Sequence, residues 1–228
     1  GFFFEVKENY GPEMVTAFIR LNGMTVGCVA NRTEVLDEEN EKTAEYEPVL
    51  GARGCDKAAE FVSFCDAFNI PVLALVNVKG YKQSKCTERR IAKAAGRLTY
   101  AFANADVPKV TVVIGEAYGS AYVTMNSKSI GADIVYAWPD AKIGMMDAAA
   151  AVKIMYAEEI SASDKAAALI SEKAAEYEAL QSSAAAAAGR GYVDDIIKAD
   201  ETRQRVIAAF EMLFTKREGR PSRKHGTV

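Results

Sequence analysis

The chain has 228 residues, of which 50% are hydrophobic and 26% charged, and its formal net charge is −3. A chain of this length can bury a substantial core, and without a basic excess no nucleic acid is expected as a main partner. No apolar stretch approaches the ~20 residues that span a bilayer and no signal peptide is visible, so we expect a cytoplasmic protein with no membrane span.

The first part of the chain predicts three short strands and a loop. The strands are expected at 2–7, 14–21 and 25–31, and Asn22-Gly23 between the last two is a hairpin signal. The stretch 32–54 is polar, acidic and without an apolar period, which predicts a loop.

The middle of the chain alternates between helical and apolar strand patterns. Asp56 is expected to cap the first of these helices. The runs at 72–78 and 109–114 are almost continuously apolar, which is typical of strands buried on both faces. In order, we expect a helix at 57–68, a strand at 72–78, a polar loop at 79–86, a helix at 87–105 and a strand at 109–114. This alternation predicts an α/β sheet covered by helices.

The last part of the chain becomes helical after Asp147. We expect a single domain over 1–228 whose basic end, 217–228, is a flexible tail. The expected segments are a helix at 119–131, strands at 134–138 and 142–145 around a turn at 139–140, and helices at 148–157, 163–188 and 199–216.

A run of small residues at 117–122 carries the clearest indication of chemistry. Gly119, Ser120 and Ala121 come after an apolar strand and before a helical pattern, which predicts a tight strand-to-helix turn. Small side chains leave backbone N–H groups uncovered there, and the start of a helix adds partial positive charge. Such a turn suits a developing oxyanion, although close packing of a strand against a helix explains the same small residues.

A second glycine turn strengthens this interpretation. Gly80 and Tyr81 also follow the end of a buried strand. Because the carboxyl ends of neighbouring parallel strands meet at one crevice, two such turns can each give one backbone N–H to a shared hole. Glu116 and Asp147 are the acidic residues nearest this crevice, and each is either a proton acceptor or a solvated surface carboxylate.

Other chemistry is sparse. The single histidine, His225, lies in the tail, so no Ser-His-Asp or Cys-His arrangement and no histidine-bound metal is expected. The glycine patterns of phosphate loops and of dinucleotide-binding folds are absent from the sequence. The cysteines form no C-x-x-C pair, so we expect reduced, packed thiols at Cys28, Cys55, Cys65 and Cys86.

Several motifs in a fixed order carry a family resemblance. They are Phe-Val-Ser-Phe-Cys-Asp-Ala-Phe-Asn-Ile-Pro at 61–71, Leu-Thr-Tyr-Ala-Phe-Ala at 98–103, Val-Pro-Lys-Val at 107–110, Ala-Tyr-Gly-Ser-Ala-Tyr at 117–122, Gly-Ala-Asp at 131–133 and Ala-Trp-Pro at 137–139. With these motifs the chain resembles the carboxyl-terminal half of the biotin-dependent acyl-CoA carboxyltransferases. That family includes the propionyl-CoA carboxylase β subunits and the glutaconyl-CoA decarboxylase α subunit.

The resemblance implies a crotonase-like (ClpP/crotonase) α/β fold, a spiral of β-β-α units with a helical carboxyl-terminal part. It implies that this half faces biotin, in an enzyme that moves a carboxyl group between carboxybiotin and the α-carbon of an acyl-CoA. Such an enzyme is a carboxylase or a biotin-dependent decarboxylase. The implied site has no metal and consists of the catalytic residues Gly119, Ser120 and Ala121 and the cofactor-binding residues Gly80, Tyr81 and Tyr118.

The resemblance also implies partners. The chain lacks the Met-Lys-Met sequence at which biotin is usually attached, so biotin would arrive on a separate carrier domain or carrier protein. We expect the physiological polypeptide to be longer, with an amino-terminal carboxyltransferase half that supplies most of the acyl-CoA site. The family further implies a homo-oligomer, either a trimer or a hexamer.

The chain departs from the family pattern at two places. In the loop 79–86, Lys79-Gly80-Tyr81 stands where many relatives carry Pro-Gly-Phe and Gln83-Ser84 stands where many carry Pro-Gly. At the second place, Ser120 stands where many relatives carry glycine. Serine keeps the backbone N–H but adds a hydroxyl, and the changed loop bears on how biotin is seated. Two alternatives stay open. One is a CoA-thioester hydratase or isomerase on the same fold, with Glu116 as its acid or base, and the other is a non-catalytic oligomerisation or assembly domain.

Overall fold

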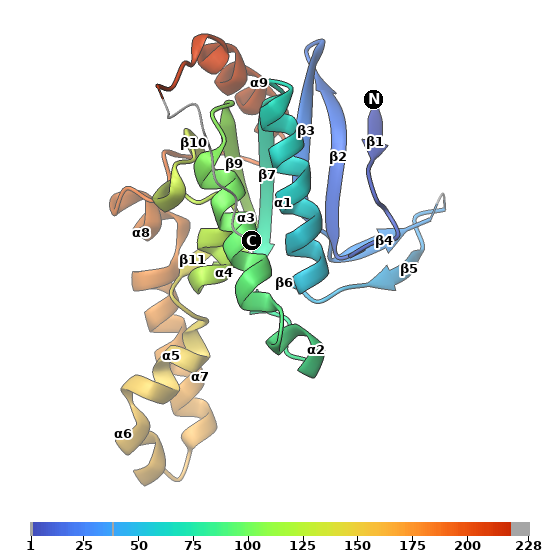
Figure 1. Cartoon of the computed structure of the whole chain (residues 1–228). Coiled ribbons are helices and arrows are strands. Elements are labelled where there is room, and N and C mark those ends of the chain that lie inside the picture. Colours follow the sequence, from blue (N-terminus) through green and yellow to red (C-terminus); the bar gives the residue numbers. More distant parts are fainter. Residues whose placement is uncertain (1, 38, 220–228) are drawn as a thin grey trace.

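The computed structural model describes residues 2–37 and 39–219. Within these residues the centre is an eight-stranded sheet in the order β1-β2-β3-β7-β9-β10-β12, with β11 paired to β9 (Figure 1). β1, β2 and β3 run antiparallel, and the later pairings in this sheet are parallel. The strands are β1 (Phe3–Glu5), β2 (Met14–Leu21), β3 (Met24–Asn31), β7 (Val72–Val78), β9 (Lys109–Tyr118), β10 (Ile134–Ala137), β11 (Lys142–Gly144) and β12 (Asp195–Ile196).

The predicted strands at 14–21 and 72–78 coincide with β2 and β7, and the hairpin lies where the sequence predicts it. Asn22 has φ 47° and Gly23 has φ 82°, so both residues adopt the left-handed conformation that a type I′ turn requires. β7 and β9 each have neighbouring strands on both sides. Their central position in a sheet covered on both faces explains why their sequences are largely apolar.

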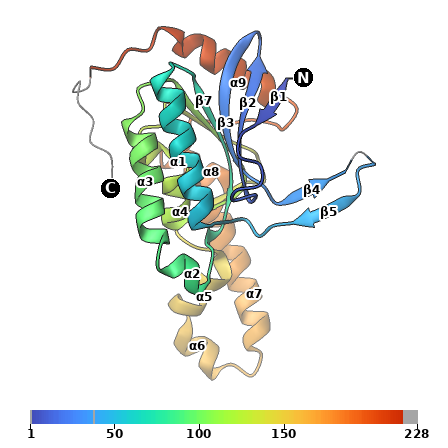
Figure 2. The same ribbon diagram turned by 45° about the vertical axis from the view of Figure 1, so that its right-hand side comes forward.

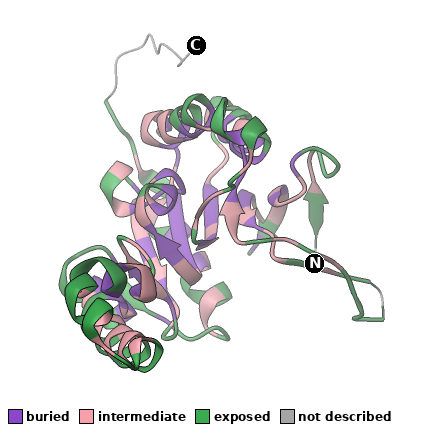
Figure 3. Cartoon of the chain, turned by 90° about the horizontal axis from the view of Figure 1, so that it is seen from below, coloured by how far each residue is buried: buried purple, intermediate pink, exposed green. Residues whose placement is uncertain are grey.

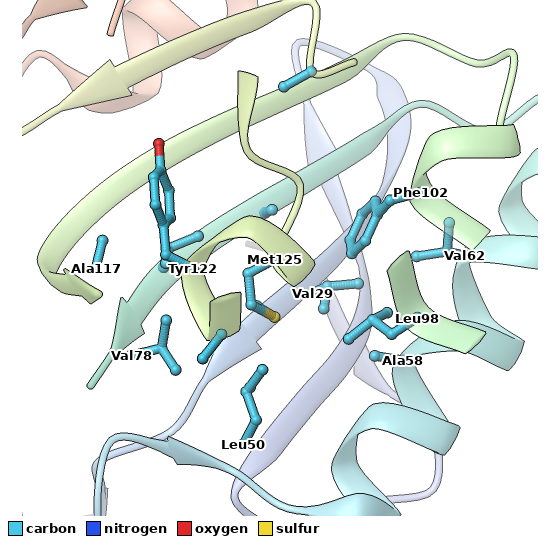
Figure 4. Packing of buried hydrophobic residues seen from close by; sticks show 14 of the residues in the cluster. Val29, Leu50, Ala58, Val62, Val78, Leu98, Phe102, Ala117, Tyr122 and Met125 are labelled. Carbon is cyan, nitrogen blue, oxygen red and sulfur yellow. The ribbon is translucent and has the colours of Figure 1, made fainter. Parts of the chain in front are cut away.

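Helices cover both faces of this sheet. On one face α1 (Ala52–Ala67) and α3 (Ile91–Asn104) pack against each other and, together with α4 (Gly119–Thr124), enclose the main core (Figures 1 and 4). On the other face α9 (Thr202–Met212) closes a smaller core with residues of β2, β3, β7 and β9. Figure 3 shows the buried residues concentrated in the central strands, with the outward sides of the helices exposed.

The first helix begins earlier than predicted. α1 starts at Ala52 with Gly51 as its N-cap and no side-chain cap, so Asp56 lies inside the helix rather than at its start. The Asp56 carboxylate instead lies 3.1 Å from a guanidinium nitrogen of Arg97 and 3.6 Å from one of Arg90. The first turn of α1 consists largely of small, buried residues, so packing and not a capping side chain determines where the helix begins.

The stretch 32–54 holds more structure than the predicted loop. β4 (Glu34–Leu36) and β5 (Lys42–Glu45) form a separate antiparallel ribbon that projects from the body, and β6 (Val49–Leu50) pairs with β8 (Gly80–Tyr81) (Figures 1 and 2). Most residues of the ribbon are exposed. It therefore lacks the alternation of apolar and polar residues by which a half-buried strand is recognised in a sequence.

The loop and helix predicted between β7 and β9 divide differently in the structure. β8 and a short helix, α2 (Lys85–Glu88), lie in this segment, and α3 begins only at Ile91. Ser84 caps α2, because its hydroxyl oxygen accepts a hydrogen bond from the N–H of Thr87 at 3.2 Å. The apolar pattern of the sequence predicted the longer helix α3. The Ser84 cap starts the separate short helix α2 before it, which the pattern did not predict.

Residues 148–177 form an arm of helices that projects from the sheet, whereas β12 and α9 further along the chain return to it (Figures 1 and 2). The helix predicted at 163–188 is divided by a π-helical turn, and β12 follows in a segment where no strand was predicted. None of the helices in the described part of the chain is long and apolar enough to cross a membrane. The arm, as we use the name, consists of α5 (Ala148–Met155), α6 (Ala157–Ala162) and α7 (Ala166–Tyr177). The π-helical turn Glu178–Ser182 and α8 (Ala184–Gly189) follow it.

The start of the predicted tail is anchored by ion pairs. Lys216 Nζ lies 2.9 Å from Asp133 Oδ2 and 2.7 Å from Glu218 Oε1. His225 and the rest of the predicted tail from 220 onward lie outside the described residues.

The four cysteines are free thiols, and three of them are packed in the interior. Burial raises the pKa of the Cys28, Cys55 and Cys65 thiols to about 12, because the charged thiolate is poorly solvated there. Cys86 is exposed, so the prediction of packed thiols is wrong at this one position.

Candidate active site

The strand-to-helix junction is tighter than the sequence suggests. β9 continues to Tyr118, and α4 starts at the very next residue. Gly119 makes this possible, because its φ of 59° lies in the left-handed region and turns the chain within one residue. The helix ends at Thr124 instead of reaching 131, and a separate 3-10 turn follows at Lys128–Ile130.

Gly119 is also packed too closely for a side chain. A Cβ atom there would lie 3.0 Å from the carbonyl oxygen of Met145, whereas a Cβ atom at Gly80 would meet no atom within 4 Å. We therefore expect Gly119→Ala to lower the free energy of unfolding by about 1–3 kcal/mol, and Gly80→Ala to change it by less than about 1 kcal/mol. Urea denaturation of the two variants measures the difference, and equal effects would contradict the strain assigned to position 119.

The first turn of α4 offers backbone donors. Ser120 is exposed and Ala121 is buried. Neither N–H has a hydrogen-bond acceptor among residues 2–37 and 39–219, as is usual for the first turn of a helix. Because neither N–H is used within the described residues, each keeps its capacity to donate one hydrogen bond.

The second predicted turn lies beside the first. Val78 at the end of β7 pairs with Ala117 of β9, so the chain leaves both strands at the same edge of the sheet. Tyr81 and Ser120 line one hollow of about 460 Å³ between β8, α3 and α4, which we call the hollow. Gly80 is held by backbone pairing with Val49 and does not line it. The remaining lining residues are Ile91, Ala92, Ala95, Gly96, Thr99, Val123 and Thr124.

Two threonine hydroxyls that sequence reasoning missed, those of Thr99 and Thr124, meet the predicted Tyr81 in the lining of the hollow. Thr124 Oγ1 lies 3.1 Å from Tyr81 Oη and 3.2 Å from Thr99 Oγ1. Thr124 also donates to the carbonyl oxygen of Ser120 at 2.9 Å. The four-residue spacing of Ser120 and Thr124 in a helical pattern is the one sequence signal for this cluster, since threonine hydroxyls often bond to the carbonyl one turn earlier.

Tyr118, predicted to bind the cofactor, lies apart from these residues. It is the last residue of β9, pairs with Gly144 of β11, and is buried without lining the hollow. Burial, and to a smaller degree the nearby Glu116 carboxylate, raises the pKa of its hydroxyl to about 12. The geometry therefore lends no support to a binding role for this residue.

The two acidic candidates each have a structural partner. Glu116 Oε2 lies 3.1 Å from Lys79 Nζ, and Asp147 caps α5 by accepting from the N–H of Ala150 at 3.0 Å. Neither carboxylate lines the hollow. No three His, Cys, Asp or Glu side chains in the described part of the chain are grouped so as to hold a metal ion. The chemistry of the hollow therefore rests on backbone N–H groups and hydroxyls.

The chain is similar to known proteins over its whole length. A family model described as "Carboxyl transferase domain" matches residues 1–228. The methylmalonyl-CoA carboxyltransferase 12S subunit of Propionibacterium freudenreichii subsp. shermanii is 42% identical over 227 residues, which are 99% of this chain and 41% of that protein. The methylmalonyl-CoA decarboxylase subunit alpha of Propionigenium modestum is 40% identical over 229 residues, which cover 100% of this chain and 42% of that protein.

Solved structures show the same fold. The transcarboxylase 12S structure, a hexamer assembly with methylmalonyl-coenzyme A and methylmalonic acid bound, superimposes with a TM-score of 0.88 at 41% identity. The match covers 99% of this chain and 42% of that one, so the chain spans about two fifths of the length of these relatives. The crotonase-like α/β fold expected from the sequence motifs is thereby confirmed.

Proposed function

This chain belongs to the carboxyl transferase domain family, and on that basis we propose that it is the biotin-facing half of an enzyme that moves a carboxyl group between carboxybiotin and the α-carbon of an acyl-CoA. The names of its relatives include a carboxyltransferase, carboxylases and decarboxylases, which supports this class of reaction in either direction. The observation that carries the proposal is the pair of unpaired N–H donors at Ser120 and Ala121, beside the hollow that Ser120 and Tyr81 line.

The hollow suits the ureido ring of a carried biotin. Its volume of about 460 Å³ lies within the range of small-molecule pockets, and most of its lining is small or apolar. The few polar groups are backbone N–H donors and hydroxyls, which match a neutral urea oxygen better than a charged ligand. When bound, biotin supplies the ring nitrogen that carries the carboxyl group.

The N–H groups of Ser120 and Ala121 would donate to the ureido oxygen. Because α4 fixes their direction before any reaction, they would supply partial positive charge for a negatively charged oxygen held at that position. Small and apolar side chains such as Ala95 and Val123 line the hollow beside these donors and leave room for a flat ring. This arrangement requires no side-chain base in the chain, which agrees with the structural partners of Glu116 and Asp147.

The other components of the reaction come from outside this chain. Because the sequence holds no Met-Lys-Met, we assign biotin to a separate carrier protein or domain. Because the chain spans only 41% to 43% of the length of its first relatives, we assign the acyl-CoA thioester site largely to an amino-terminal carboxyltransferase half.

We place the contacts of a homo-oligomer on the arm. α7 has 12 residues and packs against α5, yet none of its residues is buried, so much of its surface has no partner within the described residues. Large apolar side chains on or next to the arm remain exposed at Met145, Ile154, Met155 and Leu180. The hexamer assembly of the transcarboxylase 12S relative supports a trimer or hexamer here.

A transfer assay tests this function. The chain is joined to the remainder of the transcarboxylase 12S relative and mixed with biotinylated carrier and methylmalonyl-CoA labelled in its free carboxyl group. We expect the label to reach the carrier at least about 100-fold faster than with the remainder alone. The Glu116→Gln variant should transfer the label at the same rate as the parent. If the variant instead loses activity and the parent shows hydratase activity, the hydratase alternative is favoured. An assembled enzyme that binds the carrier but transfers no label contradicts the proposal.

A further inference from the structure

The hydroxyl of Thr124 joins three elements that border the hollow. It lies on α4, while Tyr81 belongs to β8 and Thr99 to α3. Its Oγ1 is 3.1 Å from Tyr81 Oη, 3.2 Å from Thr99 Oγ1 and 2.9 Å from the carbonyl oxygen of Ser120. Thr124 is 3% exposed, so water competes little for these hydrogen bonds.

The positions of the protons follow from the chemistry of the groups. A threonine hydroxyl has one proton to donate and two lone pairs to accept with. A carbonyl oxygen only accepts, so the Thr124 proton points to Ser120. Tyr81 and Thr99 must then both donate to Thr124 Oγ1. The proton and both lone pairs of the Thr124 hydroxyl are thereby used. All three hydrogen bonds of this cluster run in the direction of the Ser120 carbonyl.

The end of this chain of hydrogen bonds is the peptide group that carries a candidate donor. The carbonyl of Ser120 and the N–H of Ala121 belong to the same planar peptide unit. A hydrogen bond to the carbonyl oxygen draws electron density through that unit and makes the N–H a better donor, and donation from Tyr81 and Thr99 polarises Thr124 in the same sense. The hydrogen bonds also fix the orientation of the peptide.

We propose that Thr124, supported by Tyr81 and Thr99, is a positioning residue for carboxyl transfer, which orients and polarises the Ser120–Ala121 peptide so that the N–H of Ala121 binds an oxyanion more strongly. This role rests on the proposed function. It also links the wall of the hollow to the donor, because Tyr81 lines the hollow and bonds to the residue that holds the peptide.

Single-hydroxyl variants test the proposal at the peptide itself. Thr124→Val and Tyr81→Phe remove one hydroxyl each with little change of shape, and Thr124→Ser retains it. In the full chain labelled with ¹⁵N, we expect the amide proton resonance of Ala121 to move upfield in Thr124→Val and by a smaller amount in Tyr81→Phe, and to keep its position in Thr124→Ser. In the double variant Thr124→Val/Tyr81→Phe, loss of the tyrosine hydroxyl should add nothing, because its acceptor is already gone.

A matched control exists in another helix. Thr202 Oγ1 likewise donates to the carbonyl one turn earlier, at Lys198, and accepts from Trp138 Nε1 at 2.9 Å. Thr202 does not line the hollow. Thr202→Val therefore removes the same kind of hydrogen-bonded hydroxyl, and it should leave both the Ala121 amide resonance and the transfer rate unchanged within about twofold.

Kinetics of the assembled transferase measure the consequence for the reaction. We expect Thr124→Val to lower kcat about three- to tenfold and Tyr81→Phe about two- to threefold, with the KM for the carrier changed less than kcat, and Thr124→Ser to restore most of the rate. These changes correspond to the loss of one or part of one net hydrogen bond in the transition state.

The outcomes separate this proposal from the function on which it rests. An Ala121 resonance that stays in place in Thr124→Val shows that Thr124 does not polarise the Ser120–Ala121 peptide, and this overturns the proposal even if the parent enzyme transfers carboxyl groups. A shifted resonance with an unchanged kcat shows that this polarisation does not contribute to carboxyl transfer, and this also overturns the proposal. A parent enzyme without transfer activity overturns the function and this role with it, whatever the spectra show. A shifted resonance with a reduced kcat that Thr124→Ser restores supports the proposal.

Discussion

Ser120→Trp is expected to lower carboxyl transfer by the assembled enzyme at least about 100-fold and to abolish saturable binding of a biotinylated carrier. Ser120 is exposed in α4 and lines the hollow, so an indole at this position fills space that the ureido ring needs. Because the serine side chain lies at the surface, the larger residue can be accommodated without rearranging the core. Isothermal titration with the carrier and the transfer assay measure the two effects.

The matched control for this variant is Ser120→Ala. It keeps the backbone N–H and the space in the hollow, so we expect transfer within about threefold of the parent. Equal loss in both variants would mean that the serine hydroxyl, rather than the hollow, carries the activity. If the isolated chain binds no carrier in either form, the titration is repeated with the chain joined to the remainder of the relative. Binding that appears then means that this remainder completes the site, and continued absence of binding means that the site is placed wrongly.

Phe102→Ala is expected to lower the free energy of unfolding by about 3–5 kcal/mol. Phe102 is 0% exposed, and its ring lies close to Val62 and Leu98 in the main core (Figure 4). Its truncation leaves a cavity between α1 and α3 that these neighbours cannot fill without moving. The hydrogen bond from Lys109 Nζ to the backbone carbonyl of residue 102, 2.7 Å long, survives the substitution, so the effect reports packing. Urea denaturation measures it.

Phe214→Ala provides the comparison of the same residue type at the surface. Phe214 is 72% exposed, and its loss should change the free energy of unfolding by less than about 1 kcal/mol. Similar values for the two variants would show that the core around Phe102 is not close-packed.

Short sequence patterns were enough to predict several elements of the fold. The almost continuous apolar run of β7 predicted a buried strand with its correct bounds, because a strand covered on both faces needs mostly apolar residues. Asn22-Gly23 predicted the hairpin, since the turn needs two residues that tolerate positive φ. Hydrogen-bonded and exposed segments such as β4 and β5 escaped prediction, because pairing of backbone groups between polar strands leaves no pattern in the side chains.

By itself, the sequence determined the α/β class, the family through its ordered motifs, and the segment from Gly119 to Ala121 as the place to look for chemistry. Only the tertiary structure decided which residues surround that segment. Thr124 meets Thr99 and Tyr81 across 25 and 43 residues of sequence. Such contacts depend on the angles and distances at which β8, α3 and α4 pack, and packing of distant elements is not encoded in any local spacing of residues.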